Sequence, residues 1–139
     1  MITGCISAVQ RVHVEAYHLV LSSSATVERV GNTASGWDIA MLGTYVELRP
    51  SAQIKAAGGA VAVGGGWGGK SELRRAVDTI VHSGASIDCD AVGLGDGGRI
   101  ALWGDRMMSM EGAVSARGGW MGGNGGWIEV AATPHSHSC

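Results

Sequence analysis

The chain has 139 residues, of which 24 are glycine and none is phenylalanine. This length suits one domain and excludes a multidomain enzyme, and a hydrophobic share of 45% is too high for a chain kept disordered by charge. The net charge of -2 provides no basic surface for nucleic acid. Each apolar run is interrupted within a few residues, so we expect no membrane span.

Short bursts of alternating apolar residues follow one another along the chain, and glycine pairs separate them. This pattern predicts short strands and turns, and it argues against helices. The clearest bursts, in chain order, are residues 12–14, 19–21, 46–48, 61–63, 100–102 and 128–130.

The bursts also recur as longer similar segments. Three alignments are evident: residues 19–27 with 46–54, residues 46–56 with 79–89, and residues 95–102 with 123–130. A repeat of this length indicates stacked units, none of which buries its apolar face alone. Equivalent residues of stacked units lie on top of one another, so we expect Ile54, Ile87 and Val114 to form one column.

Each unit carries three short strands, which predicts an all-β fold, a parallel β-helix (solenoid) of about four to five coils. We assign residues 1–131 to the repeat segment, with residues 64–78 as a loop inserted at one corner. Residues 132–139 are predicted to be a flexible tail. Strand edges would be bare at both ends of so short a stack, and this favours self-association.

Glycine pairs mark the predicted corners, where a positive φ or the close approach of two backbones excludes a side chain. Ile100 and Ile128 are predicted to point into the core, where a charged residue would unfold the stack. The predicted corner residues are Gly97, Gly98, Gly118, Gly119, Gly125 and Gly126.

Three spaced motifs near the end of the chain carry a family resemblance. They are GDGGRIALWGD at residues 95–105, GAVSARGG at residues 112–119 and GGNGGWIEV at residues 122–130. In this order they resemble the filamentous haemagglutinin family of two-partner-secreted bacterial exoproteins. The similarity covers about residues 46–131 and includes the GGGWGGK segment at residues 64–70.

The resemblance implies a right-handed β-helix that serves as the shaft of a secreted, surface-associated adhesin, without enzymatic activity. It also implies a host-cell or glycan surface and an outer-membrane secretion partner as partners, and the bacterial cell surface as location. The first residues follow no charged or apolar leader, so we expect no signal peptide in this chain. The alternative is a polysaccharide-binding or polysaccharide-cleaving β-helix protein.

Asp88 and Asp90 flank Cys89 in a predicted strand, so both carboxylates are expected on the outer face. Such a pair binds calcium or acts as acid and base on a polysaccharide. The simpler interpretation, which we adopt, is that both are solvated residues that keep the wall soluble. We therefore predict no catalytic residue and no cofactor, with Asp88 and Asp90 as the candidate metal ligands.

The tryptophans fall into two predicted classes. Trp67 and Trp120 lie in glycine-rich loops, where contact with a sugar or another protein is the predicted role. Trp103 and Trp127 border predicted strands and are expected to stack on neighbouring coils.

The three cysteines, Cys5, Cys89 and Cys139, lie too far apart for a CxxC metal or redox motif. We expect Cys89 to face inward and the thiols to be free, with one disulfide as the alternative.

Overall fold

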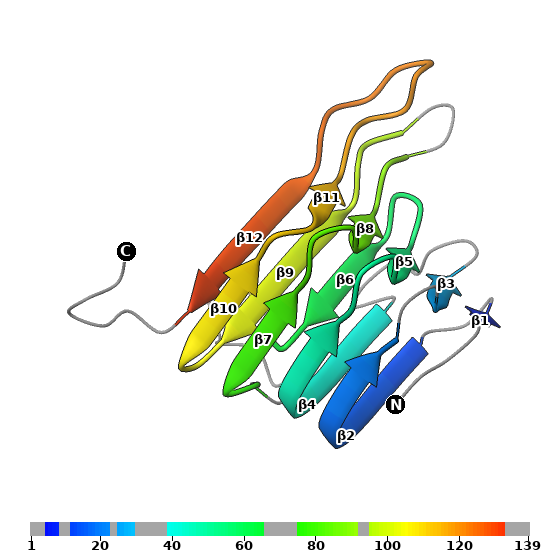
Figure 1. Ribbon diagram of the computed structural model, residues 1–139. Coiled ribbons are helices and arrows are strands. Elements are labelled where there is room, and N and C mark those ends of the chain that lie inside the picture. Colours follow the sequence, from blue (N-terminus) through cyan, green and yellow to red (C-terminus); the bar gives the residue numbers. More distant parts are fainter. Residues whose placement is uncertain are drawn as a thin grey trace.

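The computed structural model describes residues 5–8, 12–22, 25–29, 39–65, 75–91 and 95–132. Within these residues it contains strands and no helix, so none that is long and apolar enough to cross a membrane. Figure 1 shows the strands following one another in chain order from the N-terminus to the far end. They are β1 (Cys5–Ala8), β2 (Val12–Leu21), β3 (Thr26–Arg29), β4 (Ile39–Leu48), β5 (Gln53–Lys55), β6 (Ala60–Val63), β7 (Asp78–Val81), β8 (Ser86–Asp88), β9 (Arg99–Gly104), β10 (Met107–Met110), β11 (Ala113–Ser115) and β12 (Trp127–Ala132).

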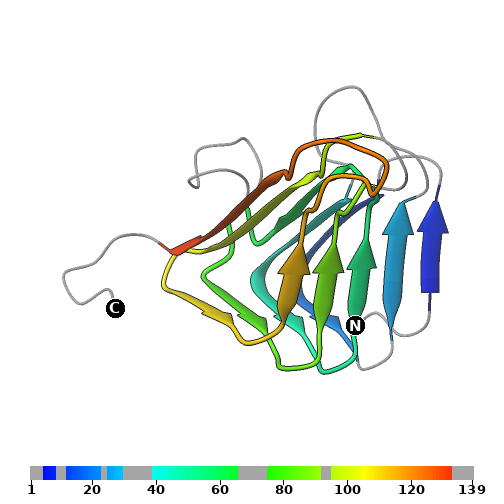
Figure 2. The same cartoon turned by 90° about the horizontal axis from the view of Figure 1, so that it is seen from above.

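The strands form two sheets, and every pair of neighbouring strands is parallel. The first, sheet B, has the order β1-β3-β5-β8-β11, and Figure 2 shows its strands side by side and pointing the same way. The second, sheet A, has the order β10-β7-β4-β6-β9-β12, with β2 paired to β4. The predicted all-β fold with parallel strands is confirmed.

Sheet A has two arms because β4 pairs with two different strands. Residues 39–41 of β4 pair with β6, and residues 45–48 pair with β7. Gly43 lies between these two parts, where a Cβ would overlap the carbonyl oxygen of Ala16 on β2. One arm continues through β9 to β12, and the other ends at β10. The segments β5-β6-β7 and β8-β9-β10 thus each add one strand to sheet B and one to each arm, whereas β11 and β12 add one strand to sheet B and one to the first arm.

Inward side chains stack in columns between the sheets. In sheet B, Val27 lies beside Ile54, Ile54 beside Ile87, and Ile87 beside Val114. The predicted column of Ile54, Ile87 and Val114 is therefore confirmed. Ile54 is 0% exposed and Ile87 is 1% exposed. Burial of aliphatic side chains at the same position of every layer supplies the main stabilising free energy.

The three predicted alignments are also confirmed by the register. Leu19 pairs with Val46, Val46 with Thr79, and Ile100 with Ile128. One difference is that residues 12–14 and 19–21, predicted as separate strands, belong to the single strand β2. Within the predicted insertion at residues 64–78, residues 66–74 lie outside the described part of the chain, and Asp78 already begins β7. Of the predicted tail, residues 133–139 lie outside the described part of the chain.

At several predicted corner glycines, backbones of different layers approach too closely for a side chain. A Cβ on Gly98 would overlap the carbonyl oxygen of Gly59, and one on Gly126 would overlap that of Gly98. A Cβ on Gly97 would likewise overlap backbone atoms. Gly125 differs, because the nearest atom to a Cβ there is 3.8 Å away. Close approach, and not positive φ, is thus what requires glycine at Gly98 and Gly126.

The two isoleucines predicted to fill the core differ in burial. Ile100 is 0% exposed, whereas its register partner Ile128 is 44% exposed. On the same strand Val130 is 42% exposed, although its partner Leu102 is 0% exposed. The cause is that β12 ends the strand order of sheet A and, among the described strands, has a neighbour on one side only. Ile128 therefore lies at the open edge of the core. The expectation that it is enclosed in the core is wrong.

This difference predicts unequal effects of the same substitution. Ile100→Asp buries an unpaired charge and should lower the free energy of unfolding by about 3–5 kcal/mol, a large part of the ~5–15 kcal/mol typical of a native domain. Ile128→Asp keeps its carboxylate near water and should leave a cooperative thermal transition. Circular dichroism melts of both variants test this, and equal losses of stability would contradict the difference in burial.

Candidate functional site

The outer wall of sheet B carries the two aspartates that the sequence singled out. Glu28, Lys55 and Asp88 lie in register on β3, β5 and β8, and they alternate along their strands with the buried column. Neighbouring strands therefore place opposite charges next to each other, which stabilises a sheet modestly. This row of charged side chains makes the outer wall of sheet B polar, so the wall is suited to face solvent.

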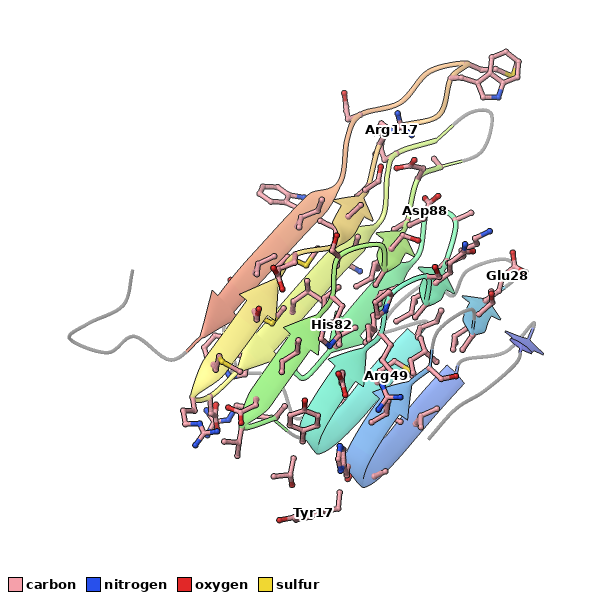
Figure 3. All side chains as sticks on the ribbon, in the orientation of Figure 1. Tyr17, Glu28, Arg49, His82, Asp88 and Arg117 are labelled. Atoms are coloured by element: carbon pink, nitrogen blue, oxygen red, sulfur yellow. The ribbon has the colours of Figure 1, made fainter. Side chains whose placement is uncertain are left out.

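Asp90 is held by two residues from the next layer. Its Oδ1 accepts hydrogen bonds from the Ser115 hydroxyl at 2.5 Å and from the backbone N–H of Arg117 at 2.6 Å. Its Oδ2 accepts from Nε and Nη2 of Arg117 at 3.1 and 3.0 Å. Figure 3 shows Arg117 just beyond β11, on the same side of the molecule as Asp88. Both oxygens of Asp90 are thus engaged in joining adjacent layers.

Asp88 is engaged within its own segment, because its Oδ1 accepts the backbone N–H of Asp90 at 2.8 Å. Both aspartates line a shallow hollow of about 210 Å³ on this wall. Within the described ranges, no group of three or more His, Cys, Asp or Glu side chains is placed to hold a metal ion. Calcium binding or acid–base chemistry at the pair would first have to break the contacts of Asp90 with Arg117.

The surroundings of Asp90 favour its charged form. Burial of the carboxylate opposes ionisation, but hydrogen bonds from the Arg117 amide, the Ser115 hydroxyl and the Arg117 guanidinium outweigh burial and lower the pKa of Asp90 below its ordinary value of 3.8. The Arg117 side chain is 82% exposed, so solvent screens the ion pair itself. The contribution to stability comes mainly from the hydrogen bonds.

Trp120 projects from a tight turn. Gly119 and Gly122 form an isolated antiparallel bridge across this turn, and a Cβ on Gly118 would lie 2.5 Å from the carbonyl oxygen of Gly123. Trp120 at the tip is 82% exposed. The structure therefore presents Trp120 to solvent, and its predicted role in contacting a sugar or protein stays a prediction. Trp67 lies outside the described residues.

The other two described tryptophans do not share one role, although the sequence suggested stacking for both. Trp103 is 6% exposed, lies against Gly65, and donates its indole N–H to Asp105 at 2.7 Å. Trp127 is 73% exposed and is the register partner of Arg99, so its expected stacking on a neighbouring coil stays a prediction. Successive residues of a strand point to opposite faces, and Ile128 points toward the core. This alternation is the sequence signal that places Trp127 on the outer face.

Cys89 is buried and faces inward, as expected, and its thiol forms no disulfide with any residue that the structure describes. Its Sγ lies 3.9 Å from the carbonyl oxygen of Arg99 inside the stack. Nothing is described of the side chains of Cys5 and Cys139. A thiol as enclosed as that of Cys89 is not available to a substrate.

The last layer carries most of the large apolar side chains that the described part of the chain exposes. Two others lie elsewhere, Tyr17 and Val77. Those in the last layer are Met107, Trp120, Met121, Trp127, Ile128 and Val130. This end of the stack is therefore an incomplete apolar surface bordered by strand edges.

Comparisons with known proteins add no assignment. No protein-family model matches the chain, and no curated protein is significantly similar to it. The function of the chain therefore has to be inferred from the geometry of its layers, its outer wall and its open end.

The contacts of Asp90 predict a specific dependence of stability on pH. Asp90→Asn should lower the free energy of unfolding at pH 7 by about 1–2 kcal/mol, because charge-assisted hydrogen bonds are lost. The pKa of Asp90 is lower in the folded state, so its stabilisation is present above pH of about 4 and is lost as the pH falls through the folded-state pKa.

Denaturant titrations of the wild type and Asp90→Asn between neutral and acid pH measure this difference. The two curves should converge below pH of about 4. Ser115→Ala, which keeps the Arg117 contacts, should lose less stability than Asp90→Asn. A constant difference between wild type and Asp90→Asn at all pH values would exclude this role.

Proposed function

We propose that this chain is a structural shaft segment, a right-handed parallel β-helix of about four to five coils, with no enzymatic activity. The observation that carries the proposal is the in-register stacking of Val27, Ile54, Ile87 and Val114 through successive layers of sheet B. Such columns transmit force along one axis, because every layer is bonded to the next by a parallel ladder.

The family resemblance of residues 95–130 supports the wider role. A filamentous-haemagglutinin-like adhesin would be exported through an outer-membrane partner and would stand on the bacterial surface facing host cells or glycans. The engagement of Asp90 by Arg117 and Ser115 supports a non-enzymatic wall. Export, the secretion partner and the surface location rest on the resemblance alone.

Duplication of one layer tests the stacked architecture. A second copy of residues 99–126, inserted after Gly126, continues the register in which Trp127 lies beside Arg99. In a linear stack each added unit contributes its own interface, so the melting temperature should rise by several degrees. An insert of the same composition in scrambled order is the control. A duplicated chain that melts lower than the wild type would contradict the proposal.

The open last layer also predicts association between copies. At high concentration the strand edges and the half-exposed Ile128 and Val130 should be covered by a second copy, and sedimentation velocity should show concentration-dependent oligomers. The double variant with Ile128→Lys and Val130→Lys should remain monomeric and folded.

The matched control for this association is Val77→Lys. Val77 is 39% exposed but lies outside the last layer, so its replacement should leave association unchanged. A wild-type chain that stays monomeric at high concentration would overturn association through the end.

A further inference from the structure

A hollow of about 180 Å³ lies where glycine corners of three layers meet. Backbone hydrogen bonds align these corners: Arg99 N–H donates to the Gly59 carbonyl at 2.8 Å, and Trp127 N–H donates to the Gly98 carbonyl at 3.0 Å. Gly125 leaves part of this space open, because the nearest atom to a Cβ there is 3.8 Å away. The glycines that line it are Gly58, Gly59, Gly97, Gly98, Gly125 and Gly126.

Three larger side chains border this corner hollow: Asp96, Arg99 and Trp127. Arg99 and Trp127 are register partners on β9 and β12, so they stand next to each other. Trp127 is 73% exposed, and an indole left in water is a strong attachment point for a ligand with an apolar face.

The two charged groups at the hollow keep unused hydrogen-bonding capacity. The exposed Arg99 side chain forms no ion pair with any described residue. Asp96 uses Oδ1 to accept the backbone N–H of Asn124 at 2.8 Å, and Oδ2 has no partner within the described ranges. A donor and an acceptor thus border the same hollow as Trp127.

This combination fits the chemistry of a sugar ring. A pyranose presents an apolar C–H face, which packs on an indole, and a rim of hydroxyls that both donate and accept hydrogen bonds. The opposite charges of Asp96 and Arg99 offset each other, so the hollow gives no preference to an anionic ligand. Its volume is below the ~300–1,000 Å³ of sites for drug-sized ligands and suits a single ring.

The hollow and the core lie on different faces of β12. Ile128 points toward the core column and Trp127, the residue before it, points to the outer face.

We propose that the corner hollow bordered by Asp96, Arg99 and Trp127 binds one neutral hexopyranose unit of a glycan. The indole of Trp127 packs on the ring, Arg99 donates to its hydroxyls and Asp96 accepts from them. This site goes beyond the shaft role and does not depend on it.

The test uses the full chain and cello-oligosaccharides as the neutral probe, with binding followed by saturation-transfer NMR and by the indole NMR signals. An open hollow of this size supports weak binding, with a Kd on the order of 1 mM. Trp127→Ala should abolish binding, and Arg99→Ala or Asp96→Asn should weaken it about tenfold. Trp127→Tyr, which keeps an aromatic face, should retain part of it.

The matched control is Trp120→Ala, because Trp120 is equally prominent at 82% exposure but does not line the hollow. This variant should bind like the wild type. Three results would overturn the proposal: no binding of the neutral probe, loss of binding in Trp120→Ala but not in Trp127→Ala, or stronger binding of heparin oligosaccharides than of the neutral probe. Layer duplication and sedimentation report on the shaft independently, so failure of either proposal is recognisable by itself.

Discussion

Parallel backbone hydrogen bonding between successive repeat units is the constraint on which the rest of this structure depends. It fixes each unit directly on the previous one, so that residues at equivalent positions become neighbours. Val27, Ile54, Ile87 and Val114 occupy one such position and are all aliphatic. The same constraint brings corner backbones together, and it leaves no room for a side chain at Gly98 or Gly126.

The register that builds the core also orders the outer wall. Glu28, Lys55 and Asp88 form a charge ladder because their strands are aligned for the core residues between them. Asp90 bonds to Ser115 and Arg117 of the next layer, so its carboxylate joins two layers. From the sequence alone, the pair Asp88 and Asp90 had suggested calcium binding or acid–base catalysis. The wall is thus explained as a solvated surface that strengthens the stack.

Two kinds of surface remain for interaction, and they face different ways. The open end exposes Ile128 and Val130, which continue core columns and fit another layer. The corner hollow exposes Trp127 beside Arg99 on the outside of the stack. The two faces of β12 thus present a continuation of the core on one side and the corner hollow on the other.

The sequence by itself determined the periodic part of this protein. Alternating apolar residues and repeated glycine pairs were sufficient to predict parallel strands, the register of Ile54 with Ile87, and the inward position of Cys89. These features follow from local periodicity and from the similarity of one unit to the next, both of which are visible without coordinates.

Only the tertiary structure decided how much of each side chain is covered, because burial depends on which layer lies beyond it. Ile128 occupies a core position but is 44% exposed, since no described strand follows β12. Trp103 and Trp127 both border strands, yet only Trp103 is buried. Likewise, the partners of Asp90 lie 25 and 27 residues further along the chain, and only the stacking of layers brings them into contact.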